Sequence, residues 1–514
     1  MAAANGVNGH TASAIYSLDE LQSHAFDYLI VGGGTAGLVL AARLTENPDV
    51  HVGVLEAGQN RLDDMLVSVP ALFSKLLGTP DGTPDYDGML ELCIPIGQKG
   101  NHNKVHAQPR GKLLGGSSGI NYMMYVRGST ADYDDWATLG EDQSWSASNL
   151  ALYLRKPQTL DPMDTNIKER GFMPLVEAFH GTERPTCTSF NEWRVPFEDK
   201  FMNACDEVAG MKQRPKDTWS CDHIGFYLRW GQWTVLNKRA QEAINLKVLT
   251  EARACNVILK NKTAIGAMFT HVGGTHKVHA MREIVVSAGC RQFSSFLVSG
   301  PLMSSKRLES NASSQVLEWA PTFKITYRKT KSKCRRCDFE AGCADQSRFF
   351  AAPTTGKDGV TFAACLQYPA SRGTVNIPSS DPLTQPAIDP AFLTHPADVA
   401  VLAAGLEFCQ RVVETAHLTS QVARRLLPEP EVNVFHRSEA AKAIHEHVAT
   451  EYHPCGSCAM GVVVDERLRV KGVKELRTVD GSVFPNHISG NLMASVYAVA
   501  EKAAGMIKED AARD

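Results

Sequence analysis

The stretch FDYLIVGGGTAG, residues 26–37, decides the fold of this chain. Its first half is a short apolar run of β-favouring residues, and glycines follow at Gly32, Gly33, Gly34 and Gly37. The next residues, LVLAARLTEN (38–47), have helical spacing, and the strand-like segment HVGVLEAG (51–58) contains Glu56 near its end. Strand, glycine turn, helix and strand in this order are typical of a dinucleotide-binding unit.

Each part of this unit has a physical task. Gly32 permits the tight turn, Gly34 lets the backbone approach a pyrophosphate, and Gly37 lets the helix pack close to the strand. The start of the helix offers free amides and a partial positive charge to phosphates, and Glu56 is placed to accept hydrogen bonds from a ribose diol. The unit by itself fits either FAD or NAD. The residues predicted to contact the dinucleotide are Gly32, Gly34, Thr35, Ala36, Gly37, Glu56 and Ala57.

Three further motifs follow in the chain. They are RGKLLGGSSGINYMMYVRG (110–128), REIVVSAG (282–289) and a C-terminal pair, YHPCGSCAMG (452–461) with LRVKGVKELRTVDGSVFPNHISGNLMASVYAVAEKAA (468–504). Together they resemble the glucose-methanol-choline (GMC) family of flavoenzymes, in particular its intracellular fungal members. The motifs occur in family order and are spread over most of the chain, which is more specific than any one of them.

The resemblance implies that the dinucleotide is FAD. The glycine–serine loop would let the backbone lie close to the flavin ring, and Ala254 would pair with adenine through its main chain. A helix beginning near Asn491 would direct its N-terminus at the pyrimidine end of the flavin. We expect no metal. The further cofactor residues that the resemblance implies are Gly115, Ser117, Asn121, Tyr122, Met123, Met124, Ala254, Asp480, Gly481, Leu492 and Met493.

The same resemblance implies a catalytic pair. Oxidation of an alcohol by a flavin needs a base for the hydroxyl proton and a carbon that faces flavin N5, to which the hydride is transferred. Imidazole suits the first task because its unperturbed pKa is about 6.5. His453 matches the family's catalytic histidine. Asn491 matches the partner position, where it can hydrogen-bond the substrate oxygen but cannot act as a base at ordinary pH.

Two nearby groups have a structural interpretation. His487 falls outside the matched position, and we expect it to be a loop residue. Cys455 and Cys458 have the CxxC spacing of redox or metal sites, but no second pair lies beside them, so we expect buried thiols. The basic run 328–336 is expected to be an exposed loop rather than part of a metal site with Cys334, Cys337 and Cys343.

Composition narrows the function classes. The chain has 514 residues, of which 43% are apolar, and a net charge of -3. This near-neutral charge gives no indication of binding to nucleic acid or to an acidic membrane. Its start lacks the basic and apolar regions of a secretory signal, and no stretch is apolar enough to span a bilayer. We therefore expect a cytoplasmic protein with reduced thiols and a small-molecule alcohol as its partner. The oligomeric state stays open.

The predicted fold class is α/β, a Rossmann-like FAD-binding domain interleaved with an α+β substrate domain on an antiparallel sheet. We assign 1–25 to a disordered tail, 26–150, 247–300 and 453–514 to the FAD-binding domain, and 151–246 and 301–452 to the substrate domain. The substrate-domain sheet is predicted from QSRFFAAP, VTFAACLQYP and GTVNIPS, followed by a long helix within 381–413.

Two segments depart from the family pattern, 229–246 and 290–343, and the chain is short between the SAG motif and His453. Divergence and an altered gene structure both fit these departures. The leading function is oxidation of a CH–OH group to a carbonyl, with a secondary-metabolite alcohol as substrate. A flavoprotein lyase on the same fold and a catalytically impaired paralogue are the alternatives, since fold does not fix reaction.

Overall fold

The structure is a computed structural model without ligands, and its described residues exclude much of the segment after the SAG motif. It describes residues 16–69, 72, 90–91, 94–106, 108–161, 177–182, 186–189, 196–212, 218–221, 230–234, 243–290, 315–317, 321–329, 359–379, 381 and 383–513. The basic run from residue 330 onward, its three cysteines and most of 290–343 therefore lie outside the described residues.

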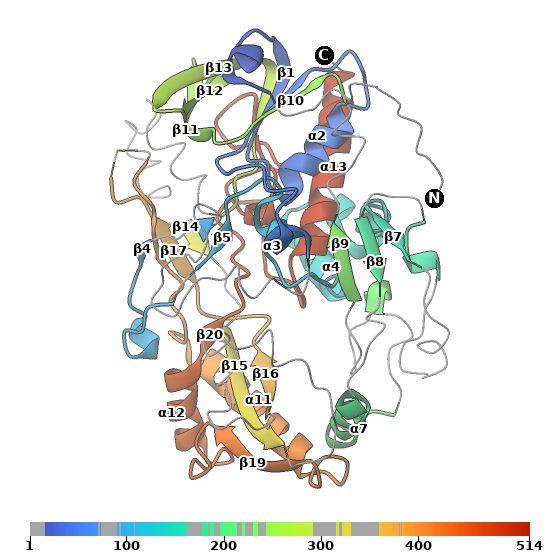
Figure 1. Cartoon of the computed structure of the whole chain (residues 1–514), viewed down its shortest axis with the longest axis vertical. Helices are drawn as coiled ribbons and strands as arrows, with labels where there is room; N and C mark the ends of the chain where they lie inside the picture. Colours follow the sequence, from blue (N-terminus) through green and yellow to red (C-terminus); the bar gives the residue numbers. More distant parts are fainter. Residues whose placement is uncertain are drawn as a thin grey trace, which may run out of the picture.

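A seven-stranded sheet forms the core of one end of the elongated molecule (Figure 1). Its strands run in the order β10-β2-β1-β13-β12-β11, and β21 pairs with β13. The strands β10, β2, β1, β13 and β21 are parallel, whereas β12 and β11 return antiparallel. The bounds are β1 (Phe26–Val31), β2 (Val52–Leu55), β10 (Leu246–Leu249), β11 (Arg253–Lys260), β12 (Thr263–His271), β13 (Gly274–Val286) and β21 (Leu476–Thr478).

The predicted strand, turn, helix and second strand are confirmed. Every residue of β1 is buried, which explains its continuous apolar run, because a central parallel strand is covered on both faces. Helix α2 (Thr35–Leu44) starts directly after the glycine turn, and α13 (Met493–Ala511) packs against it. The start of α13 lies two residues after Asn491, close to the predicted start.

An antiparallel sheet forms the core of the opposite end (Figure 1). Its strands run in the order β16-β15-β19, and β20 also pairs with β15. The side chain of Phe201 in α7 stacks on that of Phe362 in β16 with ring centroids 4.6 Å apart, so this helix packs against the sheet. The bounds are β15 (Pro321–Lys329), β16 (Gly359–Cys365), β19 (Val422–Leu427), β20 (Ala449–Thr450), α7 (Pro196–Ala209), α11 (Pro396–Glu414) and α12 (Arg437–His447).

The predicted grouping of strands in this region is partly wrong. The segment VTFAACLQYP contains β16 and the long predicted helix is α11, as expected. The segment GTVNIPS contains β17 (Gly373–Asn376), but β17 belongs to a separate sheet with order β14-β17-β18-β4. An apolar β-rich run predicts a strand but does not choose its partner. The third predicted strand, 346–353, lies outside the described residues.

Short elements fill the space between the two ends. One small sheet has the order β6-β9-β8-β7, and β3 pairs with β5. The strands are β3 (Leu90–Glu91), β4 (Ile94–Pro95), β5 (Arg110–Gly111), β6 (Met124–Tyr125), β7 (Gln158–Leu160), β8 (Thr186–Ser189), β9 (Trp230–Thr234), β14 (Gln315–Leu317) and β18 (Ala387–Asp389). The helices are α1 (Leu18–Gln22), α3 (Met65–Ser68), α4 (Thr130–Leu139) and α5 (Ala147–Arg155).

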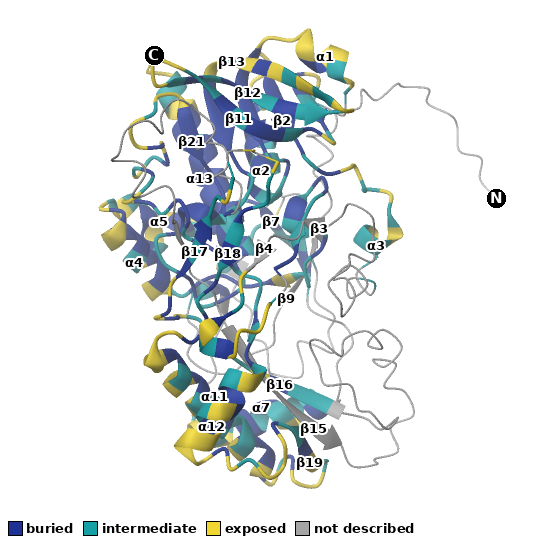
Figure 2. Cartoon of the chain, turned by 90° about the vertical axis from the view of Figure 1, so that its left-hand side faces the viewer, coloured by how far each residue is buried: buried dark blue, intermediate teal, exposed yellow. Residues whose placement is uncertain are grey.

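Buried apolar residues form two large clusters, one at each end. The first is made of residues from the parallel sheet, α4, α5 and α13. Most of α13 is buried, as Figure 2 shows. The second joins α7, α11 and α12 to the antiparallel sheet. The domain boundaries remain a prediction. Part of the expected tail is ordered, however, because the Ser17 side chain and Glu20 form a capping box that starts α1.

A buried ion-pair network holds the end of α13 on the sheet. Arg477 of β21 is 2% exposed and pairs with Glu283 of β13 and Asp510 of α13. Burial raises the pKa of Glu283 to about 7, against the opposing effect of Arg477. The guanidinium thus allows the carboxylate to be charged in an apolar setting.

Replacing Arg477 with methionine is expected to lower the free energy of unfolding by about 3 kcal/mol, because it leaves a buried carboxylate without its cation. A folded pKa above the unfolded value means that stability falls as pH rises through the folded pKa. The loss in Arg477→Met should therefore be larger near pH 8 than near pH 5, as measured by urea unfolding. An equal loss at both pH values would show that the charge of Glu283 is not the cause.

Candidate active site

A cavity of ≈ 330 Å³ opens at the carboxyl ends of β1 and β2. Ligands of doubly wound sheets bind at this edge. The structure brings most of the predicted site residues to this one cavity, although they come from five separate parts of the sequence. Those that line it are Gly32, Gly34, Thr35, Ala36, Glu56, Ala57, Ser117, Asn121, Tyr122, Met124, Ala254, His453, Asp480, Gly481, Asn491, Leu492 and Met493.

The glycine turn leaves room for a ligand at one position. A Cβ added at Gly34 would have its nearest contacts, Gly116 Cα and Ser287 O, at 3.9 Å. Gly34 is also the N-cap of α2, and no side chain caps this helix start. The bare backbone and the uncapped amides are the features that a pyrophosphate needs, so the residues present fit a dinucleotide.

Three residues predicted to contact the cofactor do not line the cavity. A Cβ at Gly37 would lie 2.0 Å from Gly32 O, so this glycine serves helix packing. Gly115 has φ +100° and its amide donates to Gly33 O at 2.8 Å, which docks the second glycine loop on the first. Met123 has φ +58° and its amide donates to Asn121 Oδ1 at 2.8 Å, so it forms a turn. These three act behind the cavity wall.

Glu56 lies at the end of β2 and is 6% exposed. Its two carboxylate oxygens accept the amides of Gly33 at 2.8 Å and Gly58 at 2.7 Å. The residue therefore shapes the glycine turn itself. A carboxylate accepts about four hydrogen bonds, so the predicted bonds to a ribose diol are compatible with these two.

Replacing Glu56 with glutamine should weaken both the turn and cofactor binding. Glutamine offers one acceptor oxygen where two amides need acceptors, and a buried unsatisfied amide costs about 1–3 kcal/mol. We expect the cofactor-free protein to unfold at lower urea concentration and the purified protein to carry less flavin. If the variant kept its stability but carried less flavin, the role of Glu56 would be limited to contact with the ligand.

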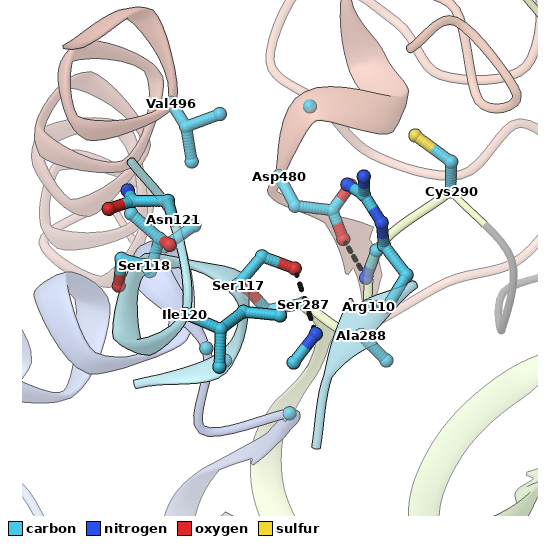
Figure 3. Close-up of a pocket in the computed structure, with 18 of the residues that line it drawn as sticks. Arg110, Ser117, Ser118, Ile120, Asn121, Ser287, Ala288, Cys290, Asp480 and Val496 are labelled. Atoms are coloured by element: carbon cyan, nitrogen blue, oxygen red, sulfur yellow. Dashed lines mark hydrogen bonds between the residues drawn. The ribbon is translucent and has the colours of Figure 1, made fainter. Parts of the chain in front are cut away.

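Asp480 also lines the cavity (Figure 3). Its oxygens accept the amide of Gly289 at 2.8 Å and the amide of Ser482 at 2.8 Å. Burial raises the pKa of Asp480, while these hydrogen bonds oppose the shift. The predicted cofactor residue thus fixes the loop after β13 to the segment after β21.

Sequence reasoning missed several residues of the cavity wall. Ser287, Ala288 and Cys290 follow β13, and Figure 3 shows them beside Asp480 and Arg110. Arg110 and Tyr452 also line the cavity. Both could have been noticed, because each is the first residue of a quoted motif.

The predicted catalytic pair is in direct contact. Asn491 Nδ2 lies 3.3 Å from His453 Nε2, at the start of α13. An amide nitrogen can only donate, so Nε2 of His453 is the acceptor in this contact and carries its lone pair. Both side chains line the cavity. An imidazole nitrogen and a hydrogen-bonding amide therefore meet at one point of the cavity.

The structural interpretations of the neighbouring residues are also supported. The His487 ring lies 6.4 Å from that of His453, is 1% exposed, and contacts Ile488 O through Nδ1 at 2.8 Å. It is a loop residue, but a buried one. Cys455 and Cys458 are fully buried, as predicted, and burial raises the pKa of the Cys458 thiol well above its usual range. Among the described residues, no group of His, Cys, Asp and Glu has the arrangement of a metal site.

Comparison with known proteins decides the family. Residues 26–316 and 369–500 match the GMC oxidoreductase family. The chain belongs to the GMC oxidoreductases. It is 32% identical to the dehydrogenase mpl7 of Monascus purpureus, with 94% of this chain and 96% of the relative covered. It is 26% identical to an alcohol dehydrogenase [acceptor] of Pseudomonas putida, with 94% and 95% covered.

Solved structures agree with the fold of this GMC oxidoreductase. An FAD-dependent oxidoreductase from Chaetomium thermophilum superposes with a TM-score of 0.82 at 24% identity, covering 94% of this chain and 99% of that chain. Pyridoxine 4-oxidase from Mesorbium loti gives a TM-score of 0.80 at 24% identity, with 94% and 99% covered. The predicted fold class is confirmed, and family membership confirms FAD as the predicted cofactor. Within the described part of the chain, helices fall short of the length and apolar character needed to cross a membrane.

Proposed function

We propose that this GMC oxidoreductase oxidises an alcohol to a carbonyl compound. The observation that carries the proposal is the contact of His453 Nε2 with Asn491 Nδ2 at 3.3 Å, inside the cavity that contains the dinucleotide turn. A base and a hydrogen-bond donor at one point are what removal of a hydroxyl proton requires.

The two side chains have different roles in this proposal. His453 accepts the hydroxyl proton at Nε2, and Asn491 donates a hydrogen bond to the substrate oxygen and so orients it. Asn491 cannot take the proton at ordinary pH, so the base function rests on the imidazole alone.

FAD, when bound, supplies the hydride acceptor of the reaction. The residues that would hold it are those of the cavity wall: the bare backbone at Gly34, the uncapped start of α2, Glu56, and the loop that Asp480 fixes. The cavity also has an apolar wall formed by Leu492, Met493 and Val496 at the start of α13. With FAD bound, such apolar groups would limit the water that reaches the cavity.

A panel of primary and secondary alcohols tests this function. The purified flavoprotein should convert at least one alcohol to its carbonyl with oxygen or an artificial dye as acceptor, and the acceptor used separates an oxidase from a dehydrogenase. Secondary-metabolite alcohols are the substrate class that we propose to place first in the panel. If the protein carries FAD and converts no alcohol of the panel to a carbonyl, the result would favour a lyase.

A further inference from the structure

The turn directly before His453 has an unusual backbone. Tyr452 has φ +61°, although it carries a full side chain. Left-handed backbone is uncommon for a residue with a side chain and persists only where the surroundings hold it. Because the conformation of Tyr452 sets the direction of the next residue, it decides where the imidazole lies.

Hydrogen bonds hold Tyr452 from both sides. Its amide donates to Thr450 Oγ1 at 2.9 Å, and Thr450 is buried and paired with Pro321 in the antiparallel sheet. Its carbonyl oxygen accepts a hydrogen bond from Nη2 of Arg110. The left-handed turn is therefore fixed to β20 on one side and to β5 on the other.

Arg110 comes from the wall of the cofactor cavity. Its Nε donates to Pro109 O at 2.8 Å, and the residue after it, Gly111, donates its amide to Ser117 Oγ at 3.2 Å. The same loop contains Gly116, where a Cβ would lie 2.8 Å from Gly34 Cα. A short chain of contacts thus runs from the dinucleotide turn through Arg110 to the residue before His453.

We propose that Arg110 is a positioning residue that holds the left-handed turn at Tyr452 and thereby directs His453 toward Asn491. This inference deepens the proposed function and rests on the role of His453 given above. Arg110 acts on the imidazole through the backbone of Tyr452, and it takes no part in proton transfer.

Two substitutions of Tyr452 separate the backbone from the phenol ring. Tyr452→Gly and Tyr452→Val both remove the phenol, but glycine adopts positive φ readily and a β-branched residue resists it. If the backbone positions His453, anaerobic flavin reduction should be at least about 10-fold faster in the glycine variant, since misplaced reacting groups cost up to about 100-fold. Equal rates in the two variants would overturn the proposal.

Crystal structures of the same pair give a readout independent of activity. The separation of Asn491 Nδ2 from His453 Nε2, 3.3 Å here, should be kept in Tyr452→Gly and lengthened in Tyr452→Val. An unchanged contact in Tyr452→Val would contradict a positioning role for the turn. Because the separation is a structural quantity, it tests the proposal even where no alcohol is turned over.

Arg110 itself is tested with a methionine and a lysine. Arg110→Met removes the donor to Tyr452 O and should slow reduction, measured per bound flavin, by about 10-fold at saturating alcohol. Arg110→Lys retains a donor and should recover part of the rate. Equal rates in Arg110→Met and wild type would overturn the proposal.

His453→Ala is measured beside these variants to keep the two hypotheses distinct. Loss of reduction in His453→Ala, with no difference between Tyr452→Gly and Tyr452→Val, would remove the positioning role and leave the proposed function intact. Unchanged reduction in His453→Ala would remove the proposed function, and the crystallographic comparison would still decide whether the turn directs the imidazole.

Discussion

Replacing His453 with alanine is expected to slow anaerobic reduction of the bound flavin by ~10²-fold or more, the usual scale of general-base catalysis. The FAD content should stay near that of the wild type. The groups expected to hold the cofactor lie in the glycine turn, Glu56 and the loop fixed by Asp480, and the hydrogen bonds given above for the two carboxylates come from backbone amides. Stopped-flow absorbance with a working alcohol measures the rate.

Asn491→Ala is the matched comparison for His453→Ala. It removes the other half of the 3.3 Å contact but leaves the base, so its loss of rate should be smaller. His487→Ala controls for a second imidazole close to the site, whose ring lies 6.4 Å from His453. If His453→Ala reduced its flavin at the wild-type rate, or if Asn491→Ala lost more rate than His453→Ala, His453 would not be the base.

Replacing Gly34 with valine is expected to give a folded protein without flavin. The backbone of Gly34 is extended, with φ -82°, so a β-branched residue fits its conformation. The nearest protein atoms to an added Cβ are 3.9 Å away, so the Cβ itself meets no obstacle within the protein. It would instead occupy the space that the pyrophosphate needs. The ratio of absorbance at 450 nm to that at 280 nm reports the flavin content.

Two other glycines give controls for this substitution. Gly505 lies in α13 and has no neighbour within 4 Å of an added Cβ, so Gly505→Val should keep its flavin. Gly37→Val should fail to fold, because its Cβ would lie 2.0 Å from Gly32 O. Full flavin in folded Gly34→Val would show that the pyrophosphate does not approach this turn.

The sequence predicted the parts of the fold that local physics determines. The strand 26–31, the glycine turn and the helix after it have patterns that short-range sterics and burial impose, and the structure has all three. The sheet position of β17 depends on partners distant in the chain, and the sequence pattern did not reveal it. Helix α1 was missed for a different reason, because its capping box of Ser17 and Glu20 is a local signal that lies in a segment assigned to the tail.

For the site, motif reasoning located the cavity better than it assigned roles within it. His453 and Asn491, 38 residues apart, were matched by motif and are in contact. Gly115 was predicted to contact the cofactor, but it docks one loop on another. The sequence could not separate the two roles, because a glycine required for backbone packing looks the same in the sequence as one required for a ligand. Arg110 opens a quoted motif, but its hydrogen bond to the backbone of Tyr452 joins residues far apart in the chain, so no local sequence pattern displays it.

Anaerobic mixing of the purified flavoprotein with an alcohol shows whether this protein oxidises alcohols. An alcohol is expected to bleach the oxidised flavin spectrum, and one carbonyl product should form for each flavin reduced. A protein that carries FAD, and whose spectrum no alcohol in a broad panel bleaches, would contradict this expectation.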